Sequence, residues 1–253
     1  LLMGFIDIIN VHAENNIIKN DQTGIPDAML YRLLLNKCDD NKDKVLSTDE
    51  ILSVYSLSSE NFGITNLKGI NLLTNLKNVS FVDENIESTE PFNGMMKLET
   101  INLTSSNVKD LSGLRYLTNL TELKLGDNKI TDISALQGLT NLRLLELYEN
   151  NISDISALRN LTNLTDLHLY ENEIVDVTPL SNMINLTELL AYDNNISDIS
   201  SFSKLTALKI LSLSNNNISD ISVLSNMIKL EELMLNNNKI VNINSLSKLN
   251  ELL

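Results

Sequence analysis

The chain has 253 residues, 43% of them hydrophobic, which is enough to bury a substantial core. Its net charge of −14 argues against nucleic acid or an anionic membrane as the main partner. A single cysteine, Cys38, excludes an internal disulfide framework and a zinc site built from several cysteines. No apolar run approaches the roughly 20 residues that a membrane-spanning helix needs, so no membrane insertion is expected.

The first thirteen residues, "LLMGFIDIINVHA", are mostly apolar and end in Val-His-Ala. This segment resembles the apolar region and the small-x-small cleavage site of a secretory signal peptide, without its basic start. We therefore predict a signal-peptide remnant over 1–13, which implies export, followed by a linker over 14–24. The alternative is an amphipathic N-terminal helix of the mature protein, and Asp7 inside the apolar run favours it.

Residues 25–56 are predicted to form a small helical cap. The stretch "IPDAMLYRLLLNK" places apolar side chains at 29, 30, 33 and 34, on one face of a helix. A second helix is expected to start at Ser47 or Thr48 and to run through "DEILSVYSL". Such a cap covers the first coil of a repeat protein.

The segment between these helices has the spacing of an EF-hand calcium loop. Side-chain oxygens recur on alternate residues, one backbone carbonyl faces inward, and a closing glutamate can bind the ion through both oxygens. Lys44 stands where the loop normally has glycine for its sharp turn. Calcium with a stabilising role is one interpretation, and a merely solvated acidic linker is the other. The candidate ligands are Asp39, Asn41, Asp43, Val45 through its carbonyl, Ser47 and Glu50.

The rest of the chain repeats every 22 residues. Counting each repeat from a leucine at position 0, apolar residues fall at positions 3, 5, 10, 13, 16 and 19. Positions 3 and 5 leave one face of a short strand and enter the core. No single coil can bury its leucines alone, so stacked coils are predicted to form a curved right-handed solenoid. The repeats start at Leu76, Leu98, Leu120, Leu142, Leu164, Leu186, Leu208 and Leu230, and a degenerate one precedes them.

Two polar positions complete the repeat. Asparagine at position 8 carries a donor and an acceptor, which can satisfy the buried turn after each strand. Aspartate at position 12 is expected to cap a short helical turn on the opposite, convex side. Glu84 and Ser106 replace the asparagine in the first two repeats, where a less regular ladder is expected.

The unit "LTNLTELKLGDNKITDISALQGL" is the leucine-rich repeat pattern, and residues 57–253 most resemble the internalins, surface proteins of Gram-positive bacteria. The resemblance implies an α/β repeat fold with a parallel sheet on the concave face and short helical turns on the convex side. It also implies that the concave face holds a protein partner such as a host receptor. The caps of internalin-like proteins resemble a truncated EF-hand. Because the chain stops where a new coil would begin, we expect the solenoid to be truncated at its C-terminal end.

The side chains at positions 2, 4 and 6 point away from the core, where recognition can be encoded. The same tyrosine occurs at position 6 of three consecutive repeats and is predicted to form one row, with acidic residues beside it at position 7. Tyrosine is a favoured contact residue in protein interfaces, and carboxylates beside it would select a basic partner. The predicted partner site comprises Tyr148, Tyr170, Tyr192, Glu146, His168, Leu190, Leu144, Glu149, Glu171 and Asp193.

The sequence thus favours a secreted or cell-surface adhesion module, expected to be monomeric. The alternative is an intracellular scaffold resembling the phosphatase-regulating leucine-rich repeat proteins, and a third interpretation is a structural wall spacer. The tyrosine row could also be a product of repeat duplication. Enzyme activity is not expected, because no nucleophile with a base and an orienting group emerges.

Overall fold

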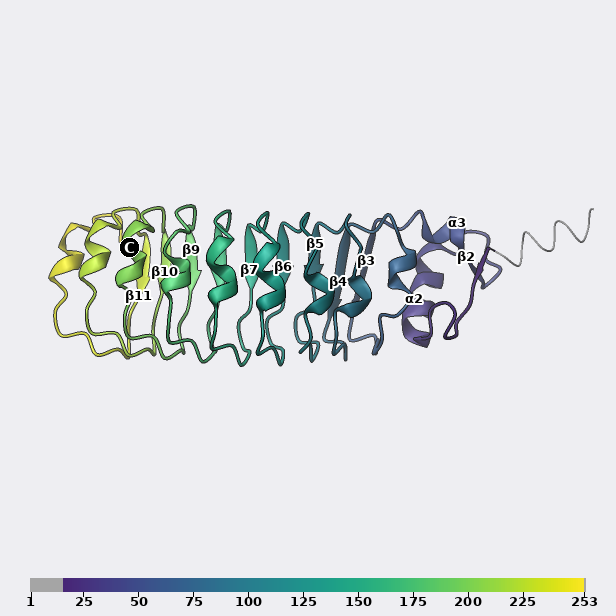
Figure 1. Cartoon of the computed structure of the whole chain (residues 1–253), viewed down its shortest axis with the longest axis horizontal. Helices are drawn as coiled ribbons and strands as arrows, with labels where there is room; N and C mark the ends of the chain where they lie inside the picture. The colour runs from purple at the N-terminus through teal and green to yellow at the C-terminus, as the bar shows by residue number, and fades with distance from the viewer. Residues whose placement is uncertain (1–15, 253) are drawn as a thin grey trace, which may run out of the picture.

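The computed structural model describes residues 16–252. The chain forms one elongated stack of coils in which each coil contributes one strand to a single parallel sheet (Figure 1). Strands β3 to β11 follow one another in chain order across this nine-stranded sheet. Every paired residue lies 22 positions from its partner, as for Leu123 and Leu145. The strands are β3 (Ser56–Glu60), β4 (Asn78–Val82), β5 (Thr100–Asn102), β6 (Glu122–Lys124), β7 (Leu144–Glu146), β8 (Asp166–His168), β9 (Glu188–Leu190), β10 (Ile210–Ser212) and β11 (Glu232–Met234).

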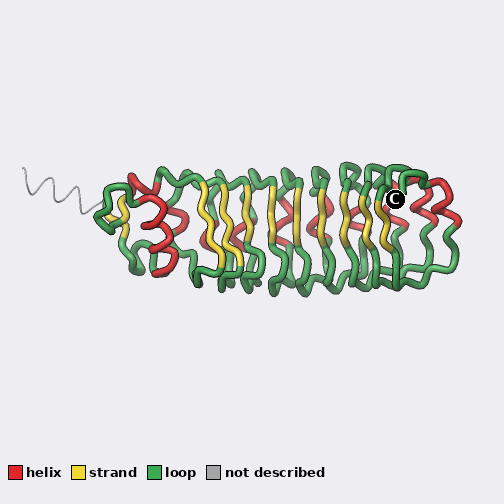
Figure 2. Tube along the Cα trace, turned by 180° about the vertical axis from the view of Figure 1, so that it is seen from behind, coloured by secondary structure: helices red, strands yellow, loops and turns green. Residues whose placement is uncertain are grey.

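Short 3-10 turns form the side opposite the sheet, so each coil has a strand on one side and a helical turn on the other (Figure 2). This confirms the predicted leucine-rich repeat solenoid. The turns cover Ile70–Leu72, Glu90–Phe92, Ser112–Leu114, Ser134–Gly138, Ser156–Asn160, Thr178–Leu180, Ser200–Lys204, Ser222–Asn226 and Asn244–Lys248.

One continuous hydrophobic core runs between the two sides. In the third repeat, Leu120, Leu123 and Leu125 are fully buried, and so are the apolar residues of the 3-10 side. The predicted repeat phase is therefore correct: positions 3 and 5 face inward. Burial weakens at the last coils, where Val241 is 96% exposed and Ile243 is 67% exposed.

The position-8 asparagines form the expected ladder. The Asn172 side-chain nitrogen donates to the carbonyls of Leu147, Leu169 and Tyr170, while its oxygen accepts from the Ile152 backbone nitrogen at 3.0 Å. One amide thus satisfies backbone groups of its own coil and of the coil before. Each copy fixes the turn that follows the strand, which is where the position-6 residues lie.

The first two repeats satisfy the same turn differently. Glu84 is 4% exposed, and its carboxylate accepts hydrogen bonds from the backbone nitrogens of Phe62, Gly63 and Ile64. The Ser106 hydroxyl donates to the Phe81 carbonyl at 2.9 Å. The ladder is irregular here, as expected, but the longer glutamate and the shorter serine still reach partners.

The position-12 aspartates lie next to the helical turns. The Asp132 carboxylate accepts from the Ser134 backbone nitrogen at 2.8 Å, and Ser134 is the first residue of its 3-10 turn. Asp154 and Ser156 repeat the contact one coil later. The aspartate therefore stabilises the start of the turn. It lies one residue before the N-cap residue, which is Ile133 in this coil.

The N-terminal cap differs from the prediction in two places. Helix α2 (Ala28–Cys38) forms as expected, but α3 (Thr48–Ile51) is only four residues long. Residues 56 and 57 belong to β3, because the serine-rich segment after Val54 is a poor helix former and its backbone pairs with β4. Strand β1 (Ile17–Ile18), within the predicted linker, pairs antiparallel with β2 (Leu46–Ser47). The predicted signal-peptide remnant lies outside the described residues.

Asp27 joins the cap to the solenoid. One carboxylate oxygen accepts from the backbone nitrogens of Met29 and Leu30 at the start of α2. The other accepts from the backbone nitrogens of Thr65 and Asn66 in the first coil, at 2.9 and 3.0 Å. The same carboxylate therefore begins the cap helix and holds it against the repeat region.

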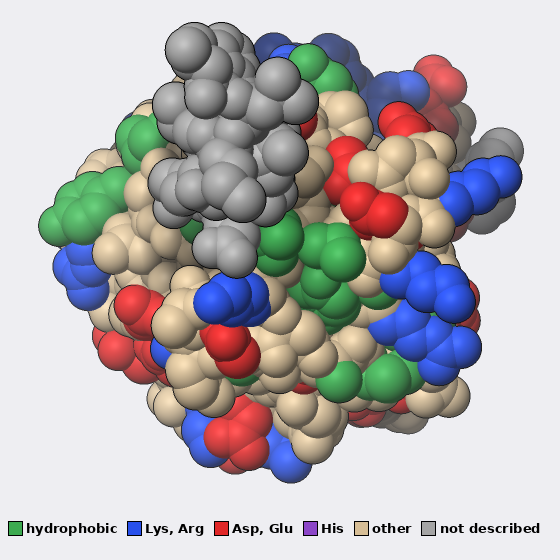
Figure 3. Space-filling model, turned by 90° about the vertical axis from the view of Figure 1, so that its right-hand side faces the viewer, with side chains coloured by type: hydrophobic (Ala, Val, Ile, Leu, Met, Phe, Trp, Pro, Cys, Tyr) green, Lys and Arg blue, Asp and Glu red, His purple; other side chains and the backbone are tan. Residues whose placement is uncertain are grey.

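The view onto the cap end shows charged and other polar atoms with several separate hydrophobic patches between them, one of them near the centre (Figure 3). Within the cap, Leu30, Leu34 and Leu46 are fully buried. The cap thus covers the first coil of the core. Over residues 16–252, none of the helices is long and apolar enough to cross a membrane.

Candidate functional site

The three tyrosines at position 6 form a stack on the solvent side of the sheet. The ring centroids of Tyr148 and Tyr170 lie 4.6 Å apart with an interplanar angle of 6°. Tyr170 and Tyr192 are 4.4 Å apart at 8°. All three are partly exposed and none is packed among the leucines of the core. We call this feature the tyrosine stack.

The stack lies just beyond the ends of β7, β8 and β9. The parallel pairing continues past the strands, since the Asp127 nitrogen donates to the Tyr148 carbonyl and the Glu149 nitrogen to the Tyr170 carbonyl, both at 2.9 Å. The asparagine ladder binds the same tyrosine carbonyls from below. The backbone beneath the rings is therefore fixed from two sides.

Gly126 makes room for the first ring. It occupies position 6 in the coil before Tyr148, and a Cβ atom placed there would lie 2.2 Å from the Tyr148 Cζ atom. A distance that short is a clash with ring carbon, so any larger residue at 126 must displace Tyr148. The glycine is thus explained by the tyrosine stack and not by its own backbone conformation.

The environment of the rings raises the pKa values of the tyrosines. For Tyr148 the main cause is burial, followed by the negative charge of Glu146, while a hydrogen bond with Thr104 acts in the opposite direction. Burial also raises the pKa of Tyr170, and negative charge on Tyr192 and Tyr148 would add to the shift. Tyr192 follows the same pattern, with burial first and Glu171 second. The tyrosine stack is therefore neutral at physiological pH and presents hydroxyl groups.

Acidic side chains line the stack at position 7. We call these four residues the acidic rim: Asp127, Glu149, Glu171 and Asp193. All four are exposed. Burial, together with the charges of Glu171 and Asp127, raises the pKa of Glu149. The rim is therefore a line of like charges close enough to repel one another.

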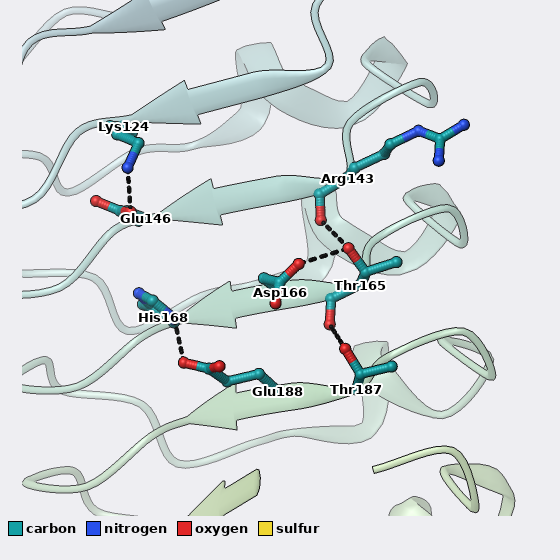
Figure 4. A network of polar contacts seen from close by, with 8 residues as sticks. All are labelled: Lys124, Arg143, Glu146, Thr165, Asp166, His168, Thr187 and Glu188. Carbon is teal, nitrogen blue, oxygen red and sulfur yellow. Dashed lines mark hydrogen bonds and ion pairs between the residues drawn. The ribbon is translucent and has the colours of Figure 1, made fainter. Parts of the chain in front are cut away.

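Behind the stack, the strands carry a polar network (Figure 4). The Lys124 ammonium lies 2.8 Å from a Glu146 carboxylate oxygen. The His168 Nε2 lies 2.9 Å from a Glu188 oxygen on the next strand. His168 also approaches the stack, with its ring 6.5 Å from that of Tyr170. The predicted site residues Glu146 and His168 are thus engaged with neighbours across the sheet and not with each other.

The predicted partner site left out three residues that the structure places next to it: Lys124, Glu188 and Gly126. The signal for the first two was present in the register: Lys124 lies directly opposite Glu146 at position 4, and Glu188 at position 2 lies diagonal to His168 at position 4. Gly126 could have been found as the small residue that precedes the tyrosines in the same row. Leu144 and Leu190 lie on the same face and are half-buried, which adds apolar area beside the polar network.

The predicted calcium loop has part of the required geometry. Lys44 has a φ of 65°, so it takes the left-handed conformation that glycine normally supplies. The Asp39, Asn41 and Asp43 side chains accept from the backbone nitrogens of Lys44, Asp43 and Val45, respectively. Glu50 instead bonds Ser47 in a capping box. Over residues 16–252 there is no group of three or more carboxylate, histidine or thiol side chains placed to hold a metal.

Comparison with known proteins agrees with this architecture. The family model described as Leucine Rich repeats (2 copies) matches residues 97–138, 118–160, 140–182 and 184–226, more than half of the chain. The chain therefore belongs to the leucine-rich repeat family. A search of curated proteins found no significant match.

Solved structures place it among internalin-like proteins. Internalin C2 from Listeria monocytogenes is similar at 27% identity and a TM-score of 0.73, covering 94% of this chain and 95% of that chain. The internalin InlF from the same organism shares 27% identity at a TM-score of 0.60, covering 90% and 80% of the two chains. The plant peptide hormone receptor RGFR1, solved in complex with RGF2, shares the fold at 23% identity and a TM-score of 0.69, over 82% of this chain and 36% of that chain.

Proposed function

We propose that this protein is a secreted or cell-surface binding module that holds a protein partner on its sheet face, at the tyrosine stack. The observation that carries the proposal is the stack itself: three partly exposed, preorganised rings where the fold requires none. Leucine-rich repeat folds bind protein partners, and one similar structure contains a receptor with a bound peptide hormone. The internalin likeness supports a location at the cell surface.

The physical basis is preorganisation. A side chain that is already fixed loses little conformational entropy on binding, so more of its contact energy appears as affinity. Each tyrosine combines large apolar area with a hydroxyl that can still find a partner. Leu144 and Leu190 extend the contact area across the sheet, and they widen the site beyond a single row of rings.

The test replaces Tyr148, Tyr170 and Tyr192 together by serine and measures capture of surface-labelled host-cell proteins. We expect capture to fall by at least about tenfold, the scale of interface hot spots. The matched control replaces Tyr55 and Tyr116, which are 56% and 63% exposed and lie outside the stack. Equal capture by the wild-type protein and the stack variant would contradict the proposal.

A second variant separates ring position from ring identity. Gly126→Ala keeps all three tyrosines but displaces Tyr148 through the clash at its ring. We expect this variant to lose part of the binding while its circular dichroism spectrum stays that of a folded solenoid.

The location of the protein is tested by a separate experiment that identifies the N-terminus of the mature chain. A mature N-terminus near residue 14 supports export, whereas retention of residues 1–13 in a cytosolic pool supports the intracellular scaffold.

We further propose that the cap loop binds calcium in a stabilising role. Two features support this: the left-handed Lys44 and a buried Asp39 Oδ1 atom with no hydrogen-bond partner. Binding would require Glu50 to leave Ser47. Since an ion that binds only the folded state adds stability, calcium should raise the melting temperature relative to chelator, and Asp39→Asn should abolish the difference. Identical melting curves with calcium and chelator would contradict calcium binding.

A further inference from the structure

We propose that one face of Tyr192, at the C-terminal end of the tyrosine stack, binds an aromatic side chain of the partner protein. This inference rests on the proposed function and specifies the chemistry of the partner at one end of the stack. It is carried by three features: the direction in which the rings lean, the short side chain that follows Tyr192 in the row, and the uncharged surface beyond it.

The three rings lean toward the N-terminal end of the solenoid. A Cβ atom on Gly126 would lie 2.2 to 2.5 Å from three carbons of the Tyr148 ring, so this ring covers the backbone of the coil before it. Tyr170 and Tyr192 are parallel to their predecessors within 8°, at centroid distances of 4.6 and 4.4 Å, and each covers the ring before it. We call the ring face that is turned toward the C-terminal end the outer face. The outer faces of Tyr148 and Tyr170 are therefore each covered by the next ring.

Tyr192 is the ring whose outer face the chain does not cover. Among the described residues 16–252, no aromatic ring stacks on this face. The next residue in the row is Ser214, which is too short to cover a ring and whose hydroxyl donates to the Asn236 side-chain oxygen at 2.5 Å. Tyr192 is also the least buried of the three rings. A ring supplied by the partner would therefore continue the stack where the chain itself ends it.

The surface beyond Tyr192 is uncharged and partly apolar. Leu190 and Met234 lie on the strands at either side of Ser212, and Met234 is 39% exposed. Ser212 is only 2% exposed, because the larger side chains beside it shield it. A stacked aromatic pair gains affinity beyond the apolar area it buries, whereas positions 4, 6 and 7 of these two coils offer a cation no carboxylate. Those six positions hold Ser212, Ser214, Asn215, Met234, Asn236 and Asn237.

The experiment uses a tryptophan peptide as the probe, because the chain itself contains no tryptophan. The probe is a short glycine and serine peptide with blocked ends and one central tryptophan, whose fluorescence is excited beyond the absorption of tyrosine. Peptides with phenylalanine, leucine or arginine at the central position compete with it. We expect the phenylalanine peptide to displace the probe, and the leucine and arginine peptides to do so at least about threefold more weakly.

Two variants with the same new side chain test the position of the site. Ser214→Leu places an aliphatic side chain over the outer face of Tyr192 and closes it. Asn236→Leu is the matched control, because it adds leucine one coil further and both variants remove the Ser214–Asn236 hydrogen bond. We expect Ser214→Leu to weaken binding of the tryptophan peptide about two- to tenfold, and the control to bind at least as tightly as the wild-type protein.

Tyr192→Leu is a second variant, and it decides the question if Ser214→Leu does not fold. It removes the ring but keeps an apolar side chain over Tyr170, and the same weakening is expected. Tyr116→Leu, at an exposed position outside the stack, should bind like the wild-type protein. Unchanged binding by Tyr192→Leu, or equal weakening by Asn236→Leu and Ser214→Leu, would overturn the inference. Displacement by the leucine or arginine peptide as strong as that by phenylalanine would overturn the aromatic partner.

Capture of host-cell proteins separates this inference from the proposed function. If the triple tyrosine-to-serine variant loses capture while Ser214→Leu keeps both capture and peptide binding, the stack is the binding site and the aromatic partner at its end is wrong. If Ser214→Leu and Tyr192→Leu lose the tryptophan peptide while the triple variant captures host proteins normally, the aromatic site stands and the proposed capture of a host protein is wrong.

Discussion

At the scale of single residues, Asp27 has two structural roles. It is the N-cap of α2, and its carboxylate also contacts Thr65 and Asn66, almost forty residues further along the chain. Burial alone would raise the pKa of this carboxyl, but its several hydrogen bonds together lower it below the ordinary value. The charged form is therefore favoured in the native state.

Replacing Asp27 by asparagine should destabilise the protein. The amide can still cap α2 through its oxygen, but it leaves the backbone nitrogens of Thr65 and Asn66 without an acceptor, at a cost of about 1–3 kcal/mol. Asp21→Asn is the control, because Asp21 is exposed and its carboxylate accepts hydrogen bonds from the nearby Thr23. Urea denaturation measures both variants, and equal stability would contradict the role of Asp27 as a link.

The pH dependence of this link follows from the lowered pKa. The native pKa of Asp27 lies below the unfolded value of about 3.9, so its contribution to stability is complete above that pH. It is lost as the pH falls through the native pKa. The Asp27→Asn variant should therefore lose less stability between neutral and strongly acid pH than the wild-type protein, when urea midpoints are compared across the range.

At the scale of elements, the asparagine ladder and the strands act together. Asn172→Ala would leave the Ile152 nitrogen without its acceptor in a buried turn and would remove one of two donors from each of three carbonyls. We expect a loss of at least about 2 kcal/mol in the free energy of unfolding. Asn238→Ala removes the same kind of contacts at a half-buried site near the end of the solenoid, and it should cost less because water reaches that turn. Similar losses at both positions would show that burial does not set the cost.

The repeat elements could be predicted from the sequence because each one recurs with the same spacing, so errors in one copy are corrected by the others. The cap occurs once and lacks that support. Its second helix was expected to extend through Leu57, although strand pairing with β4 takes Ser56 and Leu57 into the sheet. The pairing of β1 with β2 depends on residues almost thirty positions apart, which local patterns cannot reveal.

The candidate site was predictable only in part, because the repeat spacing places residues in rows but does not give their side-chain contacts. Periodicity placed Tyr148, Tyr170 and Tyr192 in one row, but it could not show that the rings stack face to face. The partner of His168 is diagonal on the next strand and that of Glu146 is directly opposite on the preceding one, so both contacts require the register and the side-chain conformations. The role of Gly126 follows only from the direction in which the Tyr148 ring leans.

At the scale of the whole molecule, the protein is a one-dimensional array in which each coil contacts mainly its neighbours. Such arrays gain stability from each added interface, and their ends are the weakest parts. Here the N-terminal end is covered by the cap, whereas burial decreases over the last coils. The tyrosine stack lies between these two ends, in coils that have a complete neighbour on each side. Its rigidity therefore derives from the central part of the array.

The composition of the stack gives the molecule a built-in optical reporter. The chain contains no tryptophan and only six tyrosines, so the three stacked rings are half of its tyrosine chromophores. Coupling between neighbouring chromophores adds to the near-ultraviolet dichroism that each fixed ring gives by itself. A ligand that settles on this face will alter that signal directly, and occupancy of the site can be followed in the unlabelled native protein.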